Sequence, residues 1–404
     1  MEVMQKSHAE ARVKELEELC QIRPTSAILA DLAACYFTLG RTEEALPLAQ
    51  KAWEKNKHSG IGMNLALILK DLGRHEESLQ VVEQAYTINS DDFYIRLGYS
   101  EGLLKAGFWK QAWLLYDNAR PTQQGAMCDL RLPGQVKEWS GVPLPDNHLL
   151  FVINEGGTGD RLSYARWLPE LTKRGINWKF YPYAELFPFF ERIFPREKLV
   201  KDGDDITATH WTTTFALPAK LNVGPTEIPP PLPLKPTQEA IDKYKIVRTD
   251  SLPIVGICYA AAEKFQGDRK VRSMTEGQAM RLICQTGDLI HYVNLQYDNV
   301  MPFPVSSIPF KTWEDTAGLI HNLDAVISVD TGVMHLAGAL NKPMAVPLSG
   351  NSCWKYLKKG KKLPLYPSAT FYRNPGRGFE EAISELVKDI RAGLFSKYSQ
   401  FVPA

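Results

Sequence analysis

A unit of 33 to 34 residues recurs three times near the start of this 404-residue chain, and a repeat of that length strongly limits the possible folds. Leu39-Gly40 returns as Leu72-Gly73 and then as Ala106-Gly107. Small residues follow each glycine at nearly constant spacing: Ala45, Ser78 and Ala112, then Ala52, Ala85 and Ala119. Glycine favours the left-handed backbone that ends a helix, and small residues let two helices approach closely. The pattern therefore predicts a stack of helix pairs.

The pattern resembles the tetratricopeptide repeat. We expect a repeat domain over residues 1–122, with three copies over about 25–121 and a preceding helix within 1–22, followed by an irregular connector over 123–148. Such arrays usually form a scaffold or a peptide-binding groove and carry no chemistry. The resemblance implies a protein or peptide partner, or self-association into a homo-oligomer. Trp109 and Trp113 are interpreted as packing residues.

The overall charge and the cysteines limit the partners and the cellular compartments that we expect for this protein. A net charge of +1 gives the chain no general attraction to nucleic acid or anionic membranes. The local exception is a lysine run over residues 355–362, interpreted as a solvated loop. The six cysteines match neither a disulfide framework nor a zinc site, and no segment reads as a signal peptide or a membrane span. We expect a cytoplasmic protein without membrane contact.

A first α/β lobe is predicted over residues 149–235. The apolar run Leu149–Ile153 reads as a buried strand, Asn154–Asp160 as a glycine-rich loop, and the segment up to Gly175 as a helix. Strand, glycine loop and helix together are typical of a nucleotide or anion crevice. The dinucleotide fingerprint is absent, because Leu162 stands where its third glycine would be. The Asp160 carboxylate could accept a proton from an acceptor hydroxyl, or it could cap its helix.

Three other features belong to this lobe. Asp202 and Asp204 form an Asp-x-Asp pair that is interpreted as a surface turn rather than a metal site. His210 is expected either on a loop that faces the crevice or in a structural position. The proline-rich stretch Pro225–Pro236 predicts an extended connector to the next lobe.

A second α/β lobe is predicted over residues 236–404. Ile254–Cys258 reads as its first strand, and a loop over 264–273 follows with the cations Lys264, Arg269, Lys270 and Arg272. This loop could neutralise a diphosphate or simply be solvated. His291–Leu295 reads as a strand that ends at Gln296, and Thr312 with Asp315 has the spacing of a helix capping box.

The most informative stretch is a strand over 324–330, a Thr331-Gly332 turn and a helix over 333–340 with His335 in its first turn. Backbone N–H groups, a hydroxyl, a glycine and an imidazole would converge at this helix start. Such a point is suited to a pyrophosphate, because the helix dipole favours negative charge there.

Taken in order, these segments resemble bacterial tetratricopeptide proteins with a glycosyltransferase family 9-like domain. These are related to heptosyltransferases and more distantly to protein O-GlcNAc transferases. The resemblance covers roughly residues 136–392 and rests on these stretches: Glu155–Asp160 with Tyr164–Pro169, Asp268–Ser273, Leu295-Gln296, Asp315–Ala317, Asn322–Asp324, Ser328–Gly332, His335–Pro343, and Trp354, Tyr366–Ser368 and Phe371–Arg373.

The resemblance implies a GT-B fold, in which two Rossmann-like lobes face one cleft. It further implies an inverting, metal-independent transfer from a nucleotide sugar whose base stays open among uridine, guanosine and adenosine, with no cofactor. Asp160 would be the base. The donor side would comprise Asp330, Thr331, Gly332 and His335, with Lys264, Arg269, Arg272, Gln296 and Asp315 nearby. The acceptor-side loop would comprise Glu155, Gly157, Thr158 and Gly159, with His210.

Two departures from the family pattern keep alternatives open. Glu155-Gly156 replaces a Glu-Gln pair beside the expected base, and Asn351–Trp354 replaces an acidic Asp-Trp-Arg-Trp stretch. The first alternative is a scaffold whose nucleotide-binding module has lost catalysis. The second is a glycosyltransferase that modifies nucleic acid through the lysine run. Between protein and glycan acceptors, the repeats favour protein.

Overall fold

The computed structural model describes residues 6–119, 136–204, 207–261, 272–297, 301 and 305–399. The chain divides into two compact units. One unit comprises Met1–Pro121 with two later segments, Ser349–Lys358 and Pro375–Gly378, and the other comprises the rest. Within the described ranges, no helix has the length and apolar character needed to span a membrane.

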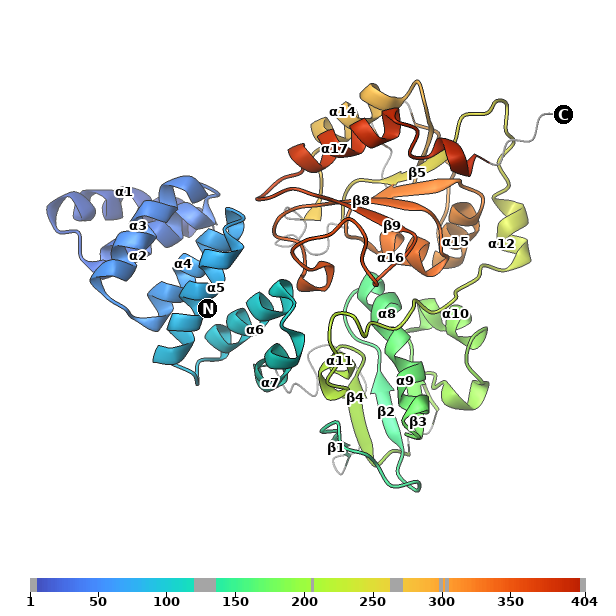
Figure 1. The fold of residues 1–404 in the computed structure, drawn as a ribbon, viewed down its shortest axis with the longest axis horizontal. Coiled ribbons are helices and arrows are strands. Elements are labelled where there is room, and N and C mark those ends of the chain that lie inside the picture. Colours follow the sequence, from blue (N-terminus) through green and yellow to red (C-terminus); the bar gives the residue numbers. More distant parts are fainter. Residues whose placement is uncertain are drawn as a thin grey trace. The chain divides into compact units, whose positions relative to one another are not determined.

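The repeat unit consists of one helix followed by three helix pairs (Figure 1). Its helices are α1 (Lys6–Ile22), α2 (Ser26–Thr38), α3 (Thr42–Lys55), α4 (Ser59–Asp71), α5 (His75–Ile88), α6 (Phe93–Ala106) and α7 (Trp109–Ala119). Gly40, Gly73 and Gly107 lie between the members of each pair, with φ values of +79°, +76° and +96°. The expected left-handed glycine at each helix end is therefore confirmed.

The repeat core contains the small residues that the sequence singled out. The side chains of Ala45, Ala52, Ala85 and Ala112 are completely buried. Trp109 and Trp113 are 2% and 3% exposed, and their rings meet edge to face with centroids 5.6 Å apart. Both tryptophans are packing residues, as predicted.

The two later segments of this unit contact the repeats at specific points. The ring of Trp354 lies edge-on to both Trp109 and Trp113, and Lys105 Nζ donates to Ser352 O at 2.7 Å. Buried Asp71 accepts hydrogen bonds from several sides: Thr42 Oγ1 at 2.8 Å, Asn351 Nδ2 at 2.7 Å and Arg377 Nε at 3.1 Å. The compact unit thus extends beyond the residue 122 boundary expected from the sequence.

Several side chains of the lysine run form contacts with other segments of the chain. Lys355 is buried, and Lys358 forms an ion pair with Glu76 within the repeat unit. In the α/β unit, Lys361 Nζ lies 2.8 Å from the Glu385 carboxylate, and Lys362 Nζ donates to Ala369 O at 2.9 Å. The prediction of a solvated loop is therefore wrong for buried Lys355 and for Lys358, which is bonded to another segment, whereas Lys359, Lys361 and Lys362 are exposed as predicted.

The first lobe is built on a parallel sheet with the strand order β1-β4-β2-β3. The strands are β1 (Lys137–Glu138), β2 (Leu150–Ile153), β3 (Trp178–Tyr181) and β4 (His210–Thr213). The one helix expected after the glycine loop is divided into α8 (Thr158–Tyr164), η1 (Ala165–Trp167) and α9 (Leu168–Lys173). Pro169 lies at the start of α9, where a proline is tolerated but cannot continue a preceding helix. Short helices complete the lobe: η2 (Ala184–Leu186), α10 (Phe187–Glu191), η3 (Arg196–Lys198) and α11 (Leu217–Lys220).

The second lobe is built on a parallel sheet with the strand order β6-β5-β7-β8-β9. Its strands are β5 (Ile254–Cys258), β6 (His291–Asn294), β7 (Ala325–Ser328), β8 (Met344–Leu348) and β9 (Ala369–Arg373). The chain moves outward from β5 to β6 and then returns to β7 on the other side. Ligands of open parallel sheets bind where the order reverses in this way, outside the carboxyl ends of the strands.

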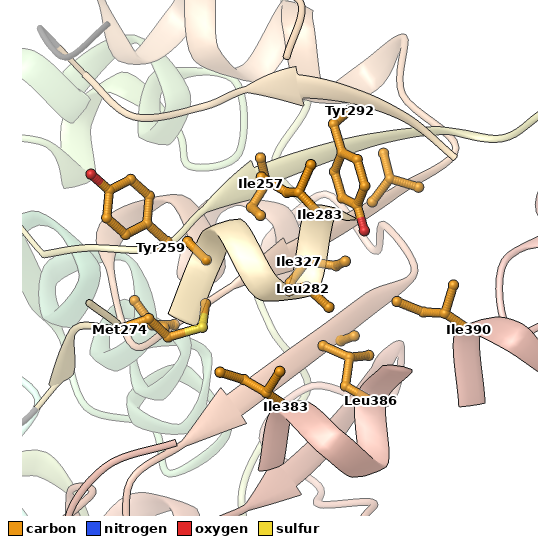
Figure 2. Packing of buried hydrophobic residues seen from close by; sticks show 14 of the residues in the cluster. Ile257, Tyr259, Met274, Leu282, Ile283, Tyr292, Ile327, Ile383, Leu386 and Ile390 are labelled. Carbon is orange, nitrogen blue, oxygen red and sulfur yellow. The ribbon is translucent and has the colours of Figure 1, made fainter. Parts of the chain in front are cut away.

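Helices cover both faces of this second sheet. They are α12 (Gln238–Lys243), α14 (Glu276–Thr286), α15 (Trp313–His321), α16 (Gly332–Ala339) and α17 (Glu380–Arg391), with η5 (Ser396–Tyr398) as a short turn. The short turn η4 (Trp354–Tyr356) belongs to the repeat unit. Figure 2 shows α14 and α17 packing on one face, where Leu282 and Ile283 meet Ile383 and Leu386 over Ile257. Helical repeats followed by two Rossmann-like lobes confirm the predicted fold class, with a GT-B arrangement in the α/β unit.

Candidate active site

Helix α16 begins at the point where the strand order of the second sheet reverses. Thr331 is its N-cap residue, and Thr331 Oγ1 accepts a hydrogen bond from Met334 N at 3.4 Å. The same oxygen lies 3.0 Å from Ser328 Oγ, and Thr331 is 9% exposed. The hydroxyl therefore serves the helix cap. What this helix start offers an anion is the dipole and the first backbone N–H groups.

His335 lies inside the fold at this helix start. It is 1% exposed, its Nδ1 lies 2.8 Å from Tyr366 Oη, and its Nε2 lies 3.5 Å from Asp330 Oδ1. Asp330 is itself 5% exposed. Both ring nitrogens thus have protein neighbours, and the imidazole is held in one orientation.

The glycine loop of the first lobe brings Asp160 to the start of α8. Asp160 is half-buried in the first turn of that helix. Gly156 has a φ of +86°, and a Cβ added there would lie 2.6 Å from Phe215 Cζ and 2.9 Å from the Asp160 Cβ. The loop is therefore closed tightly under the aspartate, and only glycine fits at residue 156 without strain.

Gly159 is where the two predicted motifs meet. A Cβ added to Gly159 would lie 2.6 Å from His335 Cδ2 and 3.3 Å from Gly332 Cα. The residue that precedes Asp160 in the first lobe therefore contacts the start of α16 in the second lobe, at a distance that leaves no space for a side chain. Gly332 is equally confined, because a Cβ on it would lie 2.6 Å from Trp313 Cη2.

Arg272 and Gln296 lie at the carboxyl edge of the second sheet. Arg272 Nη1 donates to Asp330 O at 3.4 Å, which places its guanidinium beside the end of β7. Gln296 Oε1 accepts from Ala260 N at 3.1 Å, and its Nε2 donates to Ala260 O at 2.9 Å. Gln296 thus fixes the chain where it leaves β5. Lys264 and Arg269 lie outside the described residues.

Asp315 forms the predicted capping box with Thr312. Its carboxylate also lies 2.7 Å from Lys243 Nζ. Burial alone would raise the pKa of Asp315, but hydrogen bonds from Lys243, Lys311 and Thr312 outweigh it and lower that pKa well below its ordinary value. Asp315 is engaged in the start of α15, and its neighbour Trp313 is the residue that reaches Gly332.

Two residues of the acceptor-side loop are held by the first sheet and its loops. Glu155 N donates to Thr214 Oγ1 at 3.3 Å, and Thr158 Oγ1 donates to Glu185 Oε1 at 3.1 Å. Gly157 is the N-cap residue of α8. These contacts place the loop at the carboxyl ends of β2, β3 and β4.

The expectation that His210 faces the crevice is wrong. His210 is the first residue of β4 and pairs with Leu150, the first residue of β2. The glycine loop follows the other end of β2, so the two are separated by the length of a four-residue strand. His210 instead lies beside His148, with ring centroids 5.4 Å apart, and burial together with the charges of His148 and Lys137 lowers its pKa.

The Asp-x-Asp pair forms a surface turn, as predicted. Asp204 Oδ2 accepts from Lys201 N at 2.9 Å, and Asp202 Oδ1 accepts from Tyr181 Oη at 2.6 Å. Among the residues whose structure is described, no three His, Cys, Asp or Glu side chains gather in a way that could hold a metal ion.

Comparison with known families agrees with this geometry. The model of glycosyltransferase family 9 (heptosyltransferase) matches residues 309–374, the segment that contains α15, α16 and Tyr366, and a tetratricopeptide model matches residues 63–92. Residues 309–374 are therefore similar to part of a family 9 glycosyltransferase. The matched segment contains the start of α16, while Asp160 lies in the lobe that precedes it.

Individual proteins resemble the chain more distantly. Protein FlbA of Caulobacter vibrioides is 24% identical over an alignment of 302 residues that covers 66% of this chain and 49% of that protein, so the chain spans about half the length of this relative. ADP-heptose lps heptosyltransferase II of E. coli aligns with 62% of this chain and 99% of its own, at 12% identity and a TM-score of 0.42. An O-GlcNAc transferase of Thermobaculum terrenum aligns with 97% and 89%, at 10% identity and a TM-score of 0.32.

The structure adds residues that the sequence did not single out for the site. Tyr366 bonds to His335, and Trp313 covers Gly332. Asn154 is completely buried at the end of β2, where its Oδ1 accepts from Thr214 Oγ1 at 3.3 Å. The only signal for Tyr366 in the sequence was its place in the family-like Tyr-Pro-Ser stretch, which names a resemblance but no contact.

Proposed function

We propose that this chain is an inverting glycosyltransferase that moves a sugar from a nucleotide-sugar donor to a hydroxyl acceptor without a metal ion. The observation that carries the proposal is the contact at Gly159. It brings the Asp160 loop of one lobe against the α16 helix start of the other. A base and an anion-stabilising helix start in such proximity suit a displacement that begins with a deprotonation and ends with a leaving phosphate.

In the proposed reaction Asp160 takes the proton of the acceptor hydroxyl. The acceptor oxygen attacks the anomeric carbon from the face opposite the leaving group, so the configuration inverts. The bond between that carbon and the diphosphate oxygen breaks, and its electron pair leaves with the nucleoside diphosphate. Asp160 ends the step protonated and returns its proton to water.

Charge compensation for the leaving diphosphate comes from the protein in this proposal. The helix dipole of α16 favours negative charge near Gly332, and Arg272 lies beside the end of β7. The nucleotide would lie outside the carboxyl ends of β5 and β7, where the strand order reverses. A helix start and a guanidinium can supply the stabilisation that a divalent cation gives other enzymes.

The acceptor is proposed to be a protein or a glycan, and the repeats are proposed to recruit a partner or to support self-association. The lysine run favours a nucleic-acid acceptor less than its sequence does, because Lys355 is buried and Lys358, Lys361 and Lys362 are bonded to other segments of the protein. The cytoplasm stays the expected location.

The decisive experiment compares Asp160→Asn with the unchanged protein. Uridine, guanosine and adenosine diphosphate are first titrated by calorimetry, and the matching sugar nucleotide is then used in a turnover assay. We expect Asp160→Asn to lower turnover by about 10²- to 10⁴-fold while the affinity for the diphosphate stays unchanged. Asp204→Asn, in the exposed turn of the same lobe, is the control and should retain full turnover.

Two outcomes would contradict the proposal. Near-normal turnover in Asp160→Asn would remove Asp160 as the base. Failure of the unchanged protein to bind any nucleoside diphosphate would instead favour the scaffold alternative.

A further inference from the structure

A buried arginine joins the two lobes of the α/β unit. Arg166 belongs to η1 of the first lobe, directly after the helix that carries Asp160, and it is 2% exposed. Its Nε donates to Ser163 O at 2.8 Å in its own lobe, and its Nη1 donates to Leu365 O of the second lobe at 2.6 Å. A guanidinium is costly to bury, so these bonds fix its place.

The next residue along this path is Tyr366, which is completely buried. The guanidinium of Arg166 lies 4.7 Å from the centroid of the Tyr366 ring. The ring also packs directly on Gly338 in α16, where no side chain would fit. With Arg166 and Gly338 both packed against the ring, the phenol is confined, and its hydroxyl lies 2.8 Å from His335 Nδ1.

His335 completes the path at the contact between the lobes. Its Nε2 faces Asp330, and its Cδ2 edge is the surface against which Gly159 rests. The path therefore leaves the first lobe at Arg166, passes through Tyr366 and His335, and returns to the first lobe at Gly159, one residue before Asp160.

We propose that Arg166, Tyr366 and His335 form a latch that holds the Asp160 loop in place against the start of α16. In this role Tyr366 and Arg166 are positioning residues. His335 is the residue against which Gly159 packs, rather than a ligand of the donor diphosphate. The expected effect of the latch on turnover rests on the proposed glycosyltransferase function. Misplacing a catalytic group by about 1 Å can cost about 10²-fold in rate, so the latch governs kcat.

The test uses Tyr366→Phe, which keeps the ring between Arg166 and Gly338 and removes only the hydroxyl that meets His335. We expect kcat to fall at least about tenfold, while the Kd for the nucleoside diphosphate stays within about twofold, since the α16 helix start is unchanged. Tyr372→Phe is the matched control. Tyr372 is equally buried in the same lobe, and its hydroxyl donates to Asp389 at 2.9 Å, away from the site.

A double-mutant cycle on Gly159→Ala and His335→Ala tests the packing contact between Gly159 and His335. The added methyl group of Gly159→Ala has no space beside His335, so this variant should lose turnover. Removing the imidazole frees that space, so Gly159→Ala should cost less turnover in the His335→Ala background than alone. Equal costs in both backgrounds would contradict the latch.

Other outcomes also decide. A raised Kd with unchanged kcat in Tyr366→Phe would overturn the latch and make His335 a donor ligand. If the unchanged protein turns over no donor, the proposed function fails, and the latch is then tested by distance measurements between labels at exposed Glu191 and Asp288. A broader distance distribution in Tyr366→Phe than in Tyr372→Phe supports the latch, and identical distributions overturn it.

Discussion

Gly156 lies directly under the carboxyl group of Asp160: a Cβ on residue 156 would stand 3.2 Å from Asp160 Oδ2. The backbone of Gly156 is also in the left-handed region, with a φ of +86°. Gly157 meets neither condition, because its φ is −74° and an added Cβ would lie 4.0 Å from Asp160 Oδ2. Glycine is therefore required at residue 156 but not at residue 157.

Replacing these glycines one at a time tests this difference. Gly156→Ala should lower the free energy of unfolding by about 1–3 kcal/mol through backbone strain, and it should lower turnover because the loop must shift beneath Asp160. Gly157→Ala should leave both quantities nearly unchanged. Urea unfolding and the turnover assay measure the two effects, and equal effects at the two positions would contradict the assignment.

Thr331 supports the helix start through its hydroxyl. Thr331→Val keeps the shape but removes the bonds to Met334 N and Ser328 Oγ, so it should cost about 0.5–2 kcal/mol of stability. Because the first N–H groups of α16 then lose their fixed direction, the affinity for the nucleoside diphosphate should fall as well. Thr331→Ser keeps the hydroxyl and should restore both. Calorimetry and urea unfolding give the two measurements, and a Val variant with unchanged nucleotide affinity would contradict this role.

The repeat helices could be predicted because they depend on local signals. The spacing of Gly40 and Gly73 sets the helix ends, and both residues have the expected positive φ. Strands β2, β5, β6 and β7 could also be predicted, since buried parallel strands are continuous apolar runs, whereas β1, β4, β8 and β9 were not predicted. Each of the two motifs follows the carboxyl end of a strand, as predicted, with Asp160 after β2 and Thr331 after β7. Their adjacency at Gly159 joins two different sheets, and no local pattern predicts it.

The rest depends on contacts that no local pattern records. The position of His210 follows from the register of β4 against β2, which placed it at the amino end of the strand. The contact of Arg166 with Leu365 joins residues 199 positions apart. The ion pairs of the lysine run could not be predicted for the same reason, since Glu76, the partner of Lys358, and Glu385, a partner of Lys361, come from distant segments.

Asp71 anchors the later segments within the repeat unit, which gives a stability prediction. Asp71→Ala leaves Asn351, Arg377 and Thr42 without their shared acceptor, and the site is buried. Arg377 is half exposed, so the cost comes mainly from the buried neutral donors that lose their acceptor, at about 1–3 kcal/mol. Asp31→Ala, which breaks an exposed pair with Arg12, should cost at most about 1 kcal/mol. Thermal and urea unfolding compare the stabilities of the two variants. Similar losses of stability in both would show that Asp71 contributes no more than an exposed aspartate.

His75 makes the stability of the repeat unit depend on pH. Burial, followed by the charges of Lys105, Lys70 and Lys358, lowers the pKa of His75 to about 4, although a hydrogen bond with the Gly350 backbone opposes the shift. In the unfolded chain the pKa of histidine is about 6.5. Between these pH values His75 is protonated in the unfolded chain but neutral in the folded protein. The free energy of unfolding should therefore fall as the pH drops from 6.5 toward 4.

Replacing His75 with glutamine should remove this dependence. Urea unfolding at several pH values should give a smaller acid-side loss for His75→Gln than for the unchanged protein, because the variant has no group at residue 75 to titrate. His8→Gln, which replaces an exposed histidine on α1, should retain the full loss. If all three proteins lose stability in parallel, the acid sensitivity comes from other groups, and the low pKa of His75 is wrong.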